Sequence, residues 1–420
     1  MKKKRRKNCT VHVDFQEEST YFQLIQDGSS FLEFVVAYVL SLGFQFAHKC
    51  HCSRRSAFTR HSHYARARLK GLTIWRIQCC ECKATFSILP HFVLRYRAIS
   101  AEVAKNALIA SDGGLSLERT SMILHLSAMS VYRLLCSIGV WPVAAVLLRA
   151  GLALPKYFLA DEKQSKCLAA KAYLPTIVEG RVIWHLGYTT AATAEAFQAS
   201  YAQFQQAALK ADPTYQPQGI LTDGFESTRL SLSSLFPLAV IGYCLLHAAK
   251  KVASKIKGVS AEIRQSLSRK FAKDLFAPAK LSGMEVFSLS QRLRHFSKRV
   301  EKEAGATNAL AIKDWFAQKK EGWFITLQNR PMPKTSTLLD QAHNHLDRKL
   351  FMMQHFHHQE GNKTRFINAL AILYNIIPYQ TRAKHAHQNG IQVQGGKMPH
   401  QDWFFSLMIL TSAGGMIRAG

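Results

Sequence analysis

The strongest constraint on the fold is the pattern of residues 156–250, where short apolar runs surround one amphipathic stretch. "KYFLAD" is an apolar run that ends in an acid, and "KAYLPTIVEGRVIWHLGY" has the form of a hairpin that turns at Glu179 and Gly180. "TAEAFQASYAQFQQAALK" has helical periodicity, and "QGILTD" is a second apolar run that ends in an acid. Strand, hairpin, helix, strand and helix in this order predict a mixed α/β sheet.

Two acids, Asp161 and Asp223, end the two apolar runs. A single acid of this kind is usually a solvated surface residue. Open α/β sheets, however, place their sites at the carboxyl ends of strands, so two such acids favour a site. Carboxylates there suit a pair of Mg²⁺ or Mn²⁺ ions for phosphodiester chemistry. By spacing alone, either Asp347 or Glu360 could supply a third acid.

The chain carries 55 Lys and Arg residues against 27 Asp and Glu residues, a net charge of +28. The commonest partner of so basic a protein is a polyphosphate chain such as DNA, and an anionic membrane surface is the rival. The longest apolar stretch, residues 31–47, contains Glu33 and is shorter than the roughly 20 residues needed to cross a bilayer. We therefore expect a buried helix there. The opening "MKKKRRKN" is a nuclear address, a phosphate-gripping arm or a solvated tail.

Five of the nine cysteines lie close together near the N-terminus. Without a secretory signal, this clustering indicates metal binding rather than disulfides. The expected ligands of a tetrahedral Zn²⁺ in a zinc ribbon are Cys50, Cys52, Cys79 and Cys82. Cys80 or His51 could replace one of them, and incidental buried thiols are the alternative.

Residues 98–150 show apolar residues at helical spacing in three short blocks. The "HLSAMS" between the last two blocks is typical of the turn of a helix-turn-helix, with Ser130 as the cap of the following helix. That helix would present Ser130, Tyr132 and Arg133 to DNA. An ordinary three-helix bundle is the alternative.

Residues 251–339 are predicted to be helical and are strongly basic, which suits contact with a DNA backbone. They include Trp315 and Trp323, either of which could stack on an unpaired base. A Trp on an amphipathic helix more often belongs to a core. The following block reads as a helix, a turn at Gly361 and a second helix.

The succession of "TDG", "FP" and a C-x-x-H step formed by Cys244 and His247 resembles the signature of Mutator-like transposases and their bacterial insertion-sequence relatives. "CCECKATFSILPHFVLRYRAIS", a zinc knuckle that leads into a helix-turn-helix, is also similar to bacterial insertion-sequence transposases. The resemblance covers about residues 48–380. It implies an RNase H-like (retroviral-integrase-like) core interrupted by a helical insertion domain.

The resemblance also implies a three-acid site in which Asp161 is the first acid and Asp223 the second. The family's third acid often lies in an N-x-x-E helix, and the run from Asn344 to Asp347 is similar, with Asp in place of Glu. This register favours Asp347 over Glu360 as the third ligand of two Mg²⁺ or Mn²⁺ ions.

Cys244 and His247 are expected to shape the site around these acids, with Asn344, rather than to bind its metal ions. By the same resemblance, the chain is expected to be a DNA transposase that binds terminal inverted repeats and catalyses strand cleavage and strand transfer. It would work as a dimer or larger assembly, away from membranes, at the bacterial nucleoid. The alternatives are an inactive, domesticated DNA-binding protein and an RNase H-like nuclease without strand transfer.

The expected fold class is multi-domain α/β. The expected domains are a basic arm and helix (1–47), a zinc ribbon (48–97), a helix-turn-helix (98–150), the first part of the catalytic core (151–250), a basic helical insertion (251–339), and the second part of the core with a C-terminal tail (340–420).

Overall fold

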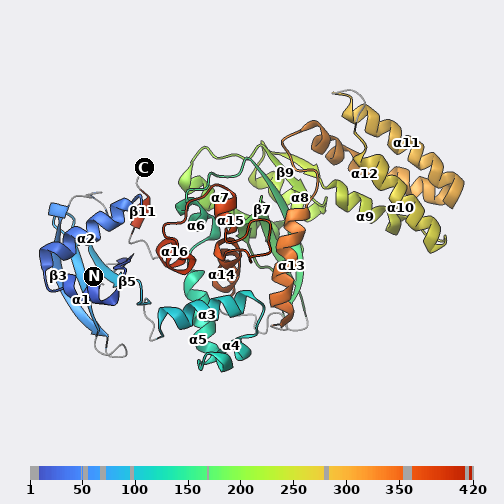
Figure 1. The fold of residues 1–420 in the computed structure, drawn as a ribbon. Helices are drawn as coiled ribbons and strands as arrows, with labels where there is room; N and C mark the ends of the chain where they lie inside the picture. Colours follow the sequence, from blue (N-terminus) through green and yellow to red (C-terminus); the bar gives the residue numbers. More distant parts are fainter. Residues whose placement is uncertain are drawn as a thin grey trace. The chain divides into compact units, whose positions relative to one another are not determined.

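The computed structural model describes residues 9–48, 50, 55–66, 72–94, 99–167, 170–278, 283–352, 362–411 and 416–418. The chain forms two compact units, whose elements are labelled in Figure 1. The first unit consists of Met1–Trp141, Ala145–Leu152 and Ile372–Gly420. The second unit consists of Pro142–Ala144 and Ala153–Ala371.

The first unit contains a four-stranded sheet. Its strands, in spatial order, are β1 (Cys9–Val13), β5 (Thr85–Pro90), β4 (Leu72–Cys79) and β3 (Phe58–Arg66). β1 and β5 are parallel, whereas the other neighbours are antiparallel. The shorter elements near this sheet in sequence are α1 (Glu18–Leu24), the 3₁₀ turn η1 (Arg55–Ala57) and β2 (Phe44–Phe46), which pairs with β11 (Met416–Arg418).

The apolar stretch at residues 31–47 forms most of helix α2 (Gly28–Ser41) and then strand β2. Asp27 caps the helix by accepting a hydrogen bond from Ser29 N. The helix buries Phe31 and Val35, so the predicted buried helix is confirmed for this part of the stretch. Within the described residues, no single helix is both long and apolar enough to cross a membrane, although one bent helix pair in the same unit meets those criteria jointly.

That bent pair belongs to a group of three helices. The group consists of α3 (Ala101–Asp112), α4 (Leu117–Ile123) and α5 (Ala128–Ile138). The chain bends by 111° between the axes of α4 and α5. The cap of α5 is Ser127, which accepts a hydrogen bond from Ser130 N at 3.1 Å, so the expectation that Ser130 is the cap is wrong by one turn. Two short helices lie later in the first unit: α15 (Gly390–Val393) and α16 (Trp403–Leu410). Two other helices have residues in both units: α6 (Val143–Arg149) and α14 (Lys363–Ile376).

The second unit is built on a five-stranded mixed sheet, which confirms the predicted mixed α/β class. Its strands, in spatial order, are β10 (Val240–Tyr243), β9 (Gly219–Thr222), β6 (Tyr157–Cys167), β7 (Ala170–Glu179) and β8 (Val182–Leu186). β6, β7 and β8 are antiparallel, whereas β9 and β10 run parallel to β6. The hairpin between β7 and β8 turns at Gly180, which has a φ of +55°. The helices beside these strands in sequence are α7 (Ala194–Ala211) and α8 (Glu226–Leu235).

After β10 the chain enters four helices that we call the helical module: α9 (Leu245–Lys255), α10 (Ala261–Phe276), α11 (Glu285–Ala304) and α12 (Ala306–Gln328). The core of the module includes an aromatic cluster of Phe271, Phe296, Trp315, Phe316 and Trp323. This corrects the expectation that Trp315 or Trp323 stacks on DNA. Their side chains are only 6% and 2% exposed, because they fill the space between the helices.

The two ends of the helical module meet at the sheet. Leu245 N, at the first residue of α9, donates a hydrogen bond to Lys334 O at 3.1 Å, beyond the end of α12. α12 also packs on β10, where Thr326 Oγ1 donates to Tyr243 O at 3.0 Å. The chain then continues into α13 (Thr337–Met352), which packs on β6 and β7.

Candidate active site

Asp161 and Asp223 lie just beyond the point where the parallel pairing of β6 and β9 ends. The expectation that Asp161 ends its strand is wrong, because β6 continues to Cys167 and pairs with β7 beyond the acid. In the parallel pairing of β6 and β9, Leu159 lies opposite Leu221. Each acid lies two residues beyond that pair, Asp161 within β6 and Asp223 just after β9. Both carboxylates therefore leave the sheet at the same level, at the edge where open α/β sheets place their sites.

A third acid, Glu162, belongs to the same cluster. One oxygen from each of Asp161, Glu162 and Asp223 lies within 4.8 Å of the other two. Thr228 of α8 donates a hydrogen bond from its hydroxyl to Glu162 Oε2 and so holds this side chain in place. Sequence reasoning missed Glu162, although two successive acids after an apolar run were a signal in a chain with only 27 acids.

A tight turn sets the position of Asp223. Gly224 has a φ of +84°, a conformation that side-chain-bearing residues rarely adopt. A Cβ at Gly224 would lie 3.4 Å from the ring of Tyr243. Asp223 Oδ1 accepts a hydrogen bond from Phe225 N at 2.7 Å, just before α8 begins. The glycine in "TDG" therefore lets the chain turn sharply while the aspartate remains at the edge of the sheet.

Burial and mutual repulsion favour protonated carboxyls in this cluster. Burial, followed by the charge of Asp223, raises the pKa of Asp161 to about 7. Burial, followed by the charge of Asp161, raises the pKa of Glu162 to about 8. Carboxyls forced together at a sheet edge in this way are characteristic of sites that bind a cation.

Lysines surround the acids. Lys251 Nζ contacts Asp223 Oδ2 at 2.8 Å, and Lys319 Nζ donates to the carbonyl oxygen of the next residue at 2.8 Å. Lys250 Nζ lies 3.5 Å from Asp340 Oδ2. The edge therefore has a negative centre and a positive rim, a distribution of charge that suits a phosphodiester held by metal ions.

Helix α13 carries two acids at different distances from the cluster. Asp340 lies in its first turn, and its charge contributes to the raised pKa of Asp161. Asp347, the acid favoured by the sequence register, lies two turns further along the helix. There, Lys163 Nζ contacts its Oδ2 at 2.7 Å, and its side chain is 43% exposed. The charge of Asp340 thus reaches Asp161, although the described group of acids whose oxygens lie within 4.8 Å of one another does not include Asp340.

Sequence reasoning missed Asp340. Asp340 and Asp347 are seven residues apart, which places them on the same face of a helix, so periodicity alone does not choose between them. Asn344, between them, is exposed. Glu360, the other predicted third acid, lies outside the described residues.

A buried histidine fixes α13 against the sheet at the level of the acids. His343 Nε2 lies 3.1 Å from Thr176 Oγ1 on β7. Thr176 is the residue opposite Asp161 in the pairing of β6 and β7. Burial lowers the pKa of His343 to about 3, so the ring is neutral and can form this hydrogen bond without an internal charge. One turn of α13 therefore separates this anchor from Asp340.

The C-x-x-H pair lies beside the acid cluster. Cys244 is the N-cap of α9, and its Sγ accepts a hydrogen bond from His247 N at 3.5 Å. Cys244 N donates to Thr222 O at 2.7 Å, one residue before Asp223. Among the described residues, the groups that could hold a metal ion do not include Cys244 or His247.

A second cluster of ligand atoms lies in the first unit. Its members are His48, Cys50, Cys79 and Cys82, whose ligand atoms lie within 4.8 Å of one another. Cys50 Sγ is 3.0 Å from His48 Nδ1 and 3.3 Å from Cys79 Sγ, and Cys82 Sγ is 3.3 Å from His48 Nδ1. Three thiols and one imidazole fit a tetrahedral structural zinc ion.

The cluster differs from the predicted zinc set at one position. His48 completes it, whereas Cys52 and His51 lie outside the described residues. Cys80 lies apart from the four, with its Sγ 3.9 Å from Ser56 O. Sequence reasoning missed His48, although the H-x-C spacing of "HKC" was a signal.

The predicted DNA-binding residues of the three-helix group lie on α5. Ser130 is half-buried, and its hydroxyl lies 2.8 Å from that of the cap, Ser127. Tyr132 is half-buried and Arg133 is exposed, so Arg133 has the most accessible side chain of the three.

No protein-family model matches this chain, and no curated protein matches it. Among solved structures, the chain is similar to the catalytic domain of Mos1 transposase, whose structure was determined with raltegravir and manganese. The match covers 39% of this chain and 94% of that chain, with 14% identity and a TM-score of 0.17. At so low a TM-score, this similarity assigns no function to the chain, and the function is inferred from the geometry of the site.

Proposed function

We propose that this chain is a DNA transposase that cuts and joins DNA strands with divalent metal ions held at the sheet edge. One observation carries the proposal: oxygens of Asp161, Glu162 and Asp223 converge within 4.8 Å where the parallel pairing of β6 and β9 ends. Carboxylates hold Mg²⁺ or Mn²⁺, and the lysine rim attracts the phosphodiester. Three antiparallel strands extended by two parallel ones are compatible with an RNase H-like core.

Each acid has a role in this proposal. Asp161 and Asp223 would hold the metal ions, which supply an activated attacking oxygen and stabilise the leaving oxygen. We assign the third acid to Asp340 instead of Asp347, because the charge of Asp340 helps to raise the pKa of Asp161 and Asp340 lies one turn from the His343 anchor. Glu162, whose pKa is raised to about 8 by burial, would accept or release a proton beside them.

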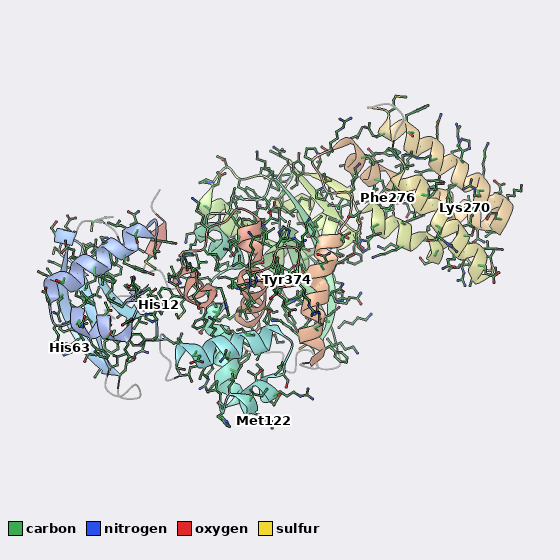
Figure 2. The ribbon with its side chains drawn as sticks, viewed as in Figure 1. His12, His63, Met122, Lys270, Phe276 and Tyr374 are labelled. Carbon is green, nitrogen blue, oxygen red and sulfur yellow. The ribbon has the colours of Figure 1, made fainter. Side chains whose placement is uncertain are left out.

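DNA recognition is assigned to other parts of the chain. The bend of 111° between α4 and α5 lies in the range of helix-turn-helix motifs, and α5 would present Ser130, Tyr132 and Arg133 to the major groove. Met122 at the tip of α4 is 75% exposed, and Figure 2 shows its side chain pointing away from the three-helix group. The basic helical module would contact the DNA backbone.

The proposal is tested with the full chain and DNA. The substrates are a duplex that carries the sequence flanking the coding region and a supercoiled target plasmid, incubated with Mg²⁺ or Mn²⁺. We expect nicks at the ends of the repeat, followed by products in which those ends are joined to the plasmid. Binding without cleavage in either metal would contradict the proposal. Cleavage that is never followed by joining would identify a nuclease instead.

The His48–Cys50–Cys79–Cys82 cluster is proposed to hold a structural zinc ion. Cys79→Ser should remove the metal and unfold the four-stranded sheet, since structural zinc contributes about 10–16 kcal/mol in small domains. Zinc content per chain and thermal melting measure the two effects. Cys80→Ser is the matched control and should retain zinc. Full zinc content in His48→Ala, with loss in Cys52→Ser, would favour the all-cysteine set over the His48 set.

The acid cluster predicts a pH-dependent stability in Mg²⁺-free buffer. Asp161 and Glu162 have pKa values of about 7 and 8, above those of an unfolded chain, so the folded protein binds more protons from about pH 4 to 8. Stability is therefore lost as pH rises through this window, by about 1.4 kcal/mol per pH unit for each proton involved. Asp161→Asn with Glu162→Gln should flatten the curve in thermal melts between pH 5 and 8. An unchanged slope would contradict the prediction.

A further inference from the structure

The C-x-x-H motif lies where two helices begin. Cys244 is the N-cap of α9, and Ser336 directly precedes Thr337, the first residue of α13. Asp340 N donates to Ser336 O at 2.9 Å, the first hydrogen bond of α13. Both residues are buried, with Cys244 1% and Ser336 4% exposed. The two helix starts are 92 residues apart in sequence yet adjacent in space.

Hydrogen bonds to one sulfur atom join the two helices. Cys244 Sγ accepts from Ser336 N at 3.3 Å and from His247 N at 3.5 Å. Ser336 Oγ lies 3.4 Å from the same sulfur and 3.1 Å from His247 Nδ1. The first backbone N–H groups of a helix have no partner within the helix, so a buried acceptor at this point satisfies groups that would otherwise be unpaired.

The same cysteine is also tied to the loop that carries Asp223. Cys244 N donates to Thr222 O at 2.7 Å, so its backbone is fixed to the end of β9. One residue thus connects two acids. Its backbone N–H holds Thr222, the residue before Asp223. Its sulfur holds Ser336, whose carbonyl oxygen accepts a hydrogen bond from Asp340 N.

We propose that Cys244 and Ser336 are positioning residues that set the spacing between Asp223 and Asp340. The inference rests on the proposed function, because it gives these two acids a shared metal ion. His247 completes the junction by holding the Ser336 hydroxyl through Nδ1. The motif therefore acts on the metal site through hydrogen bonds, and its sulfur does not bind the metal.

The test measures Mn²⁺ binding by calorimetry on the full chain with zinc retained, so it does not depend on catalysis. Cys244→Ala removes the shared acceptor and should weaken Mn²⁺ binding roughly 10- to 100-fold, the usual range for groups that orient metal ligands. Cys244→Ser keeps an acceptor and should restore most of the affinity. Ser336→Ala should weaken binding in the same direction. Cys136→Ala, at a buried cysteine of α5, is the control and should leave Mn²⁺ binding unchanged.

A double-mutant cycle separates positioning from a general loss of packing. In an Asp340→Asn background, Cys244→Ala should weaken Mn²⁺ binding by no more than about twofold, because the acid that it positions is already gone. An equal loss in both backgrounds would overturn the inference, as would full affinity in folded Cys244→Ala. If Cys244→Ala does not fold, the same cycle with Ser336→Ala decides.

The outcome also separates this inference from the proposed function. Unchanged Mn²⁺ binding in Asp223→Asn would refute the metal site itself, whatever the cysteine variants do. Weakened binding in Asp223→Asn with no effect of Cys244→Ala or Ser336→Ala would leave the metal site in place and refute only the positioning role.

Discussion

Asp223→Asn is expected to abolish DNA cleavage while leaving the fold and DNA binding intact. The amide keeps the oxygen that accepts the hydrogen bond from Phe225 N, so the turn should persist. It removes the negative charge that would hold a divalent ion. If this loss withdraws about 4 kcal/mol of transition-state stabilisation, the cleavage rate falls roughly 10³-fold.

The measurement is a single-turnover cleavage time course, with DNA binding followed in parallel. Asp212→Asn is the matched control, because Asp212 Oδ1 accepts a hydrogen bond from Thr214 N at 2.9 Å in the same local geometry, in a loop of the same unit. It should cleave like the unmodified chain. A rate for Asp223→Asn within tenfold of that of the unmodified chain would contradict a metal-binding role for this acid.

Asp340→Asn is expected to slow cleavage at least 100-fold, whereas Asp347→Asn should change it by less than about threefold. A tenfold change in rate corresponds to about 1.4 kcal/mol, so the first effect requires about 3 kcal/mol from one metal ligand. Asp347 pairs with Lys163 at a half-exposed position, and such surface ion pairs are worth about 1 kcal/mol or less.

The two substitutions also control for each other, since both remove one charge from the same face of α13. Each variant is measured in Mg²⁺ and in Mn²⁺. The reverse order of effects would restore Asp347 as the third acid, in agreement with the register of the N-x-x-E motif. Small effects from both would place the third ligand outside α13.

The sequence predicted strands β6, β7, β8 and β9 because each left a local signal, although β6 continues past the acid that ends its apolar run. The acid after "FLA" and the acid after "ILT" lie at equal offsets from the pair Leu159 and Leu221, so their proximity follows from parallel pairing alone. The C-x-x-C step was equally local, since Cys79 and Cys82 lie at the turn between β4 and β5. Patterns confined to one strand or one turn can be read without knowing the tertiary structure.

The remaining features depend on packing between distant segments. Which turn of α13 meets the sheet is decided by contacts such as that of His343 with Thr176, far apart in sequence. The burial of Trp315 and Trp323 depends on how three helices pack, and one helical pattern serves equally for a core face and a DNA-binding face. Neither feature can be read from one segment, because both form only when distant segments pack together.

The hydrogen bond between Leu245 N and Lys334 O closes the base of the helical module. Its entry and exit share one point on the sheet, so lengthening or shortening the distal helices leaves that point where it is. The free-energy cost of closing a longer helical module grows only slowly, by about 0.6 kcal/mol for each doubling of its length. A chain built this way can exchange its outer helices for others of different reach while the acids at the sheet edge keep their spacing.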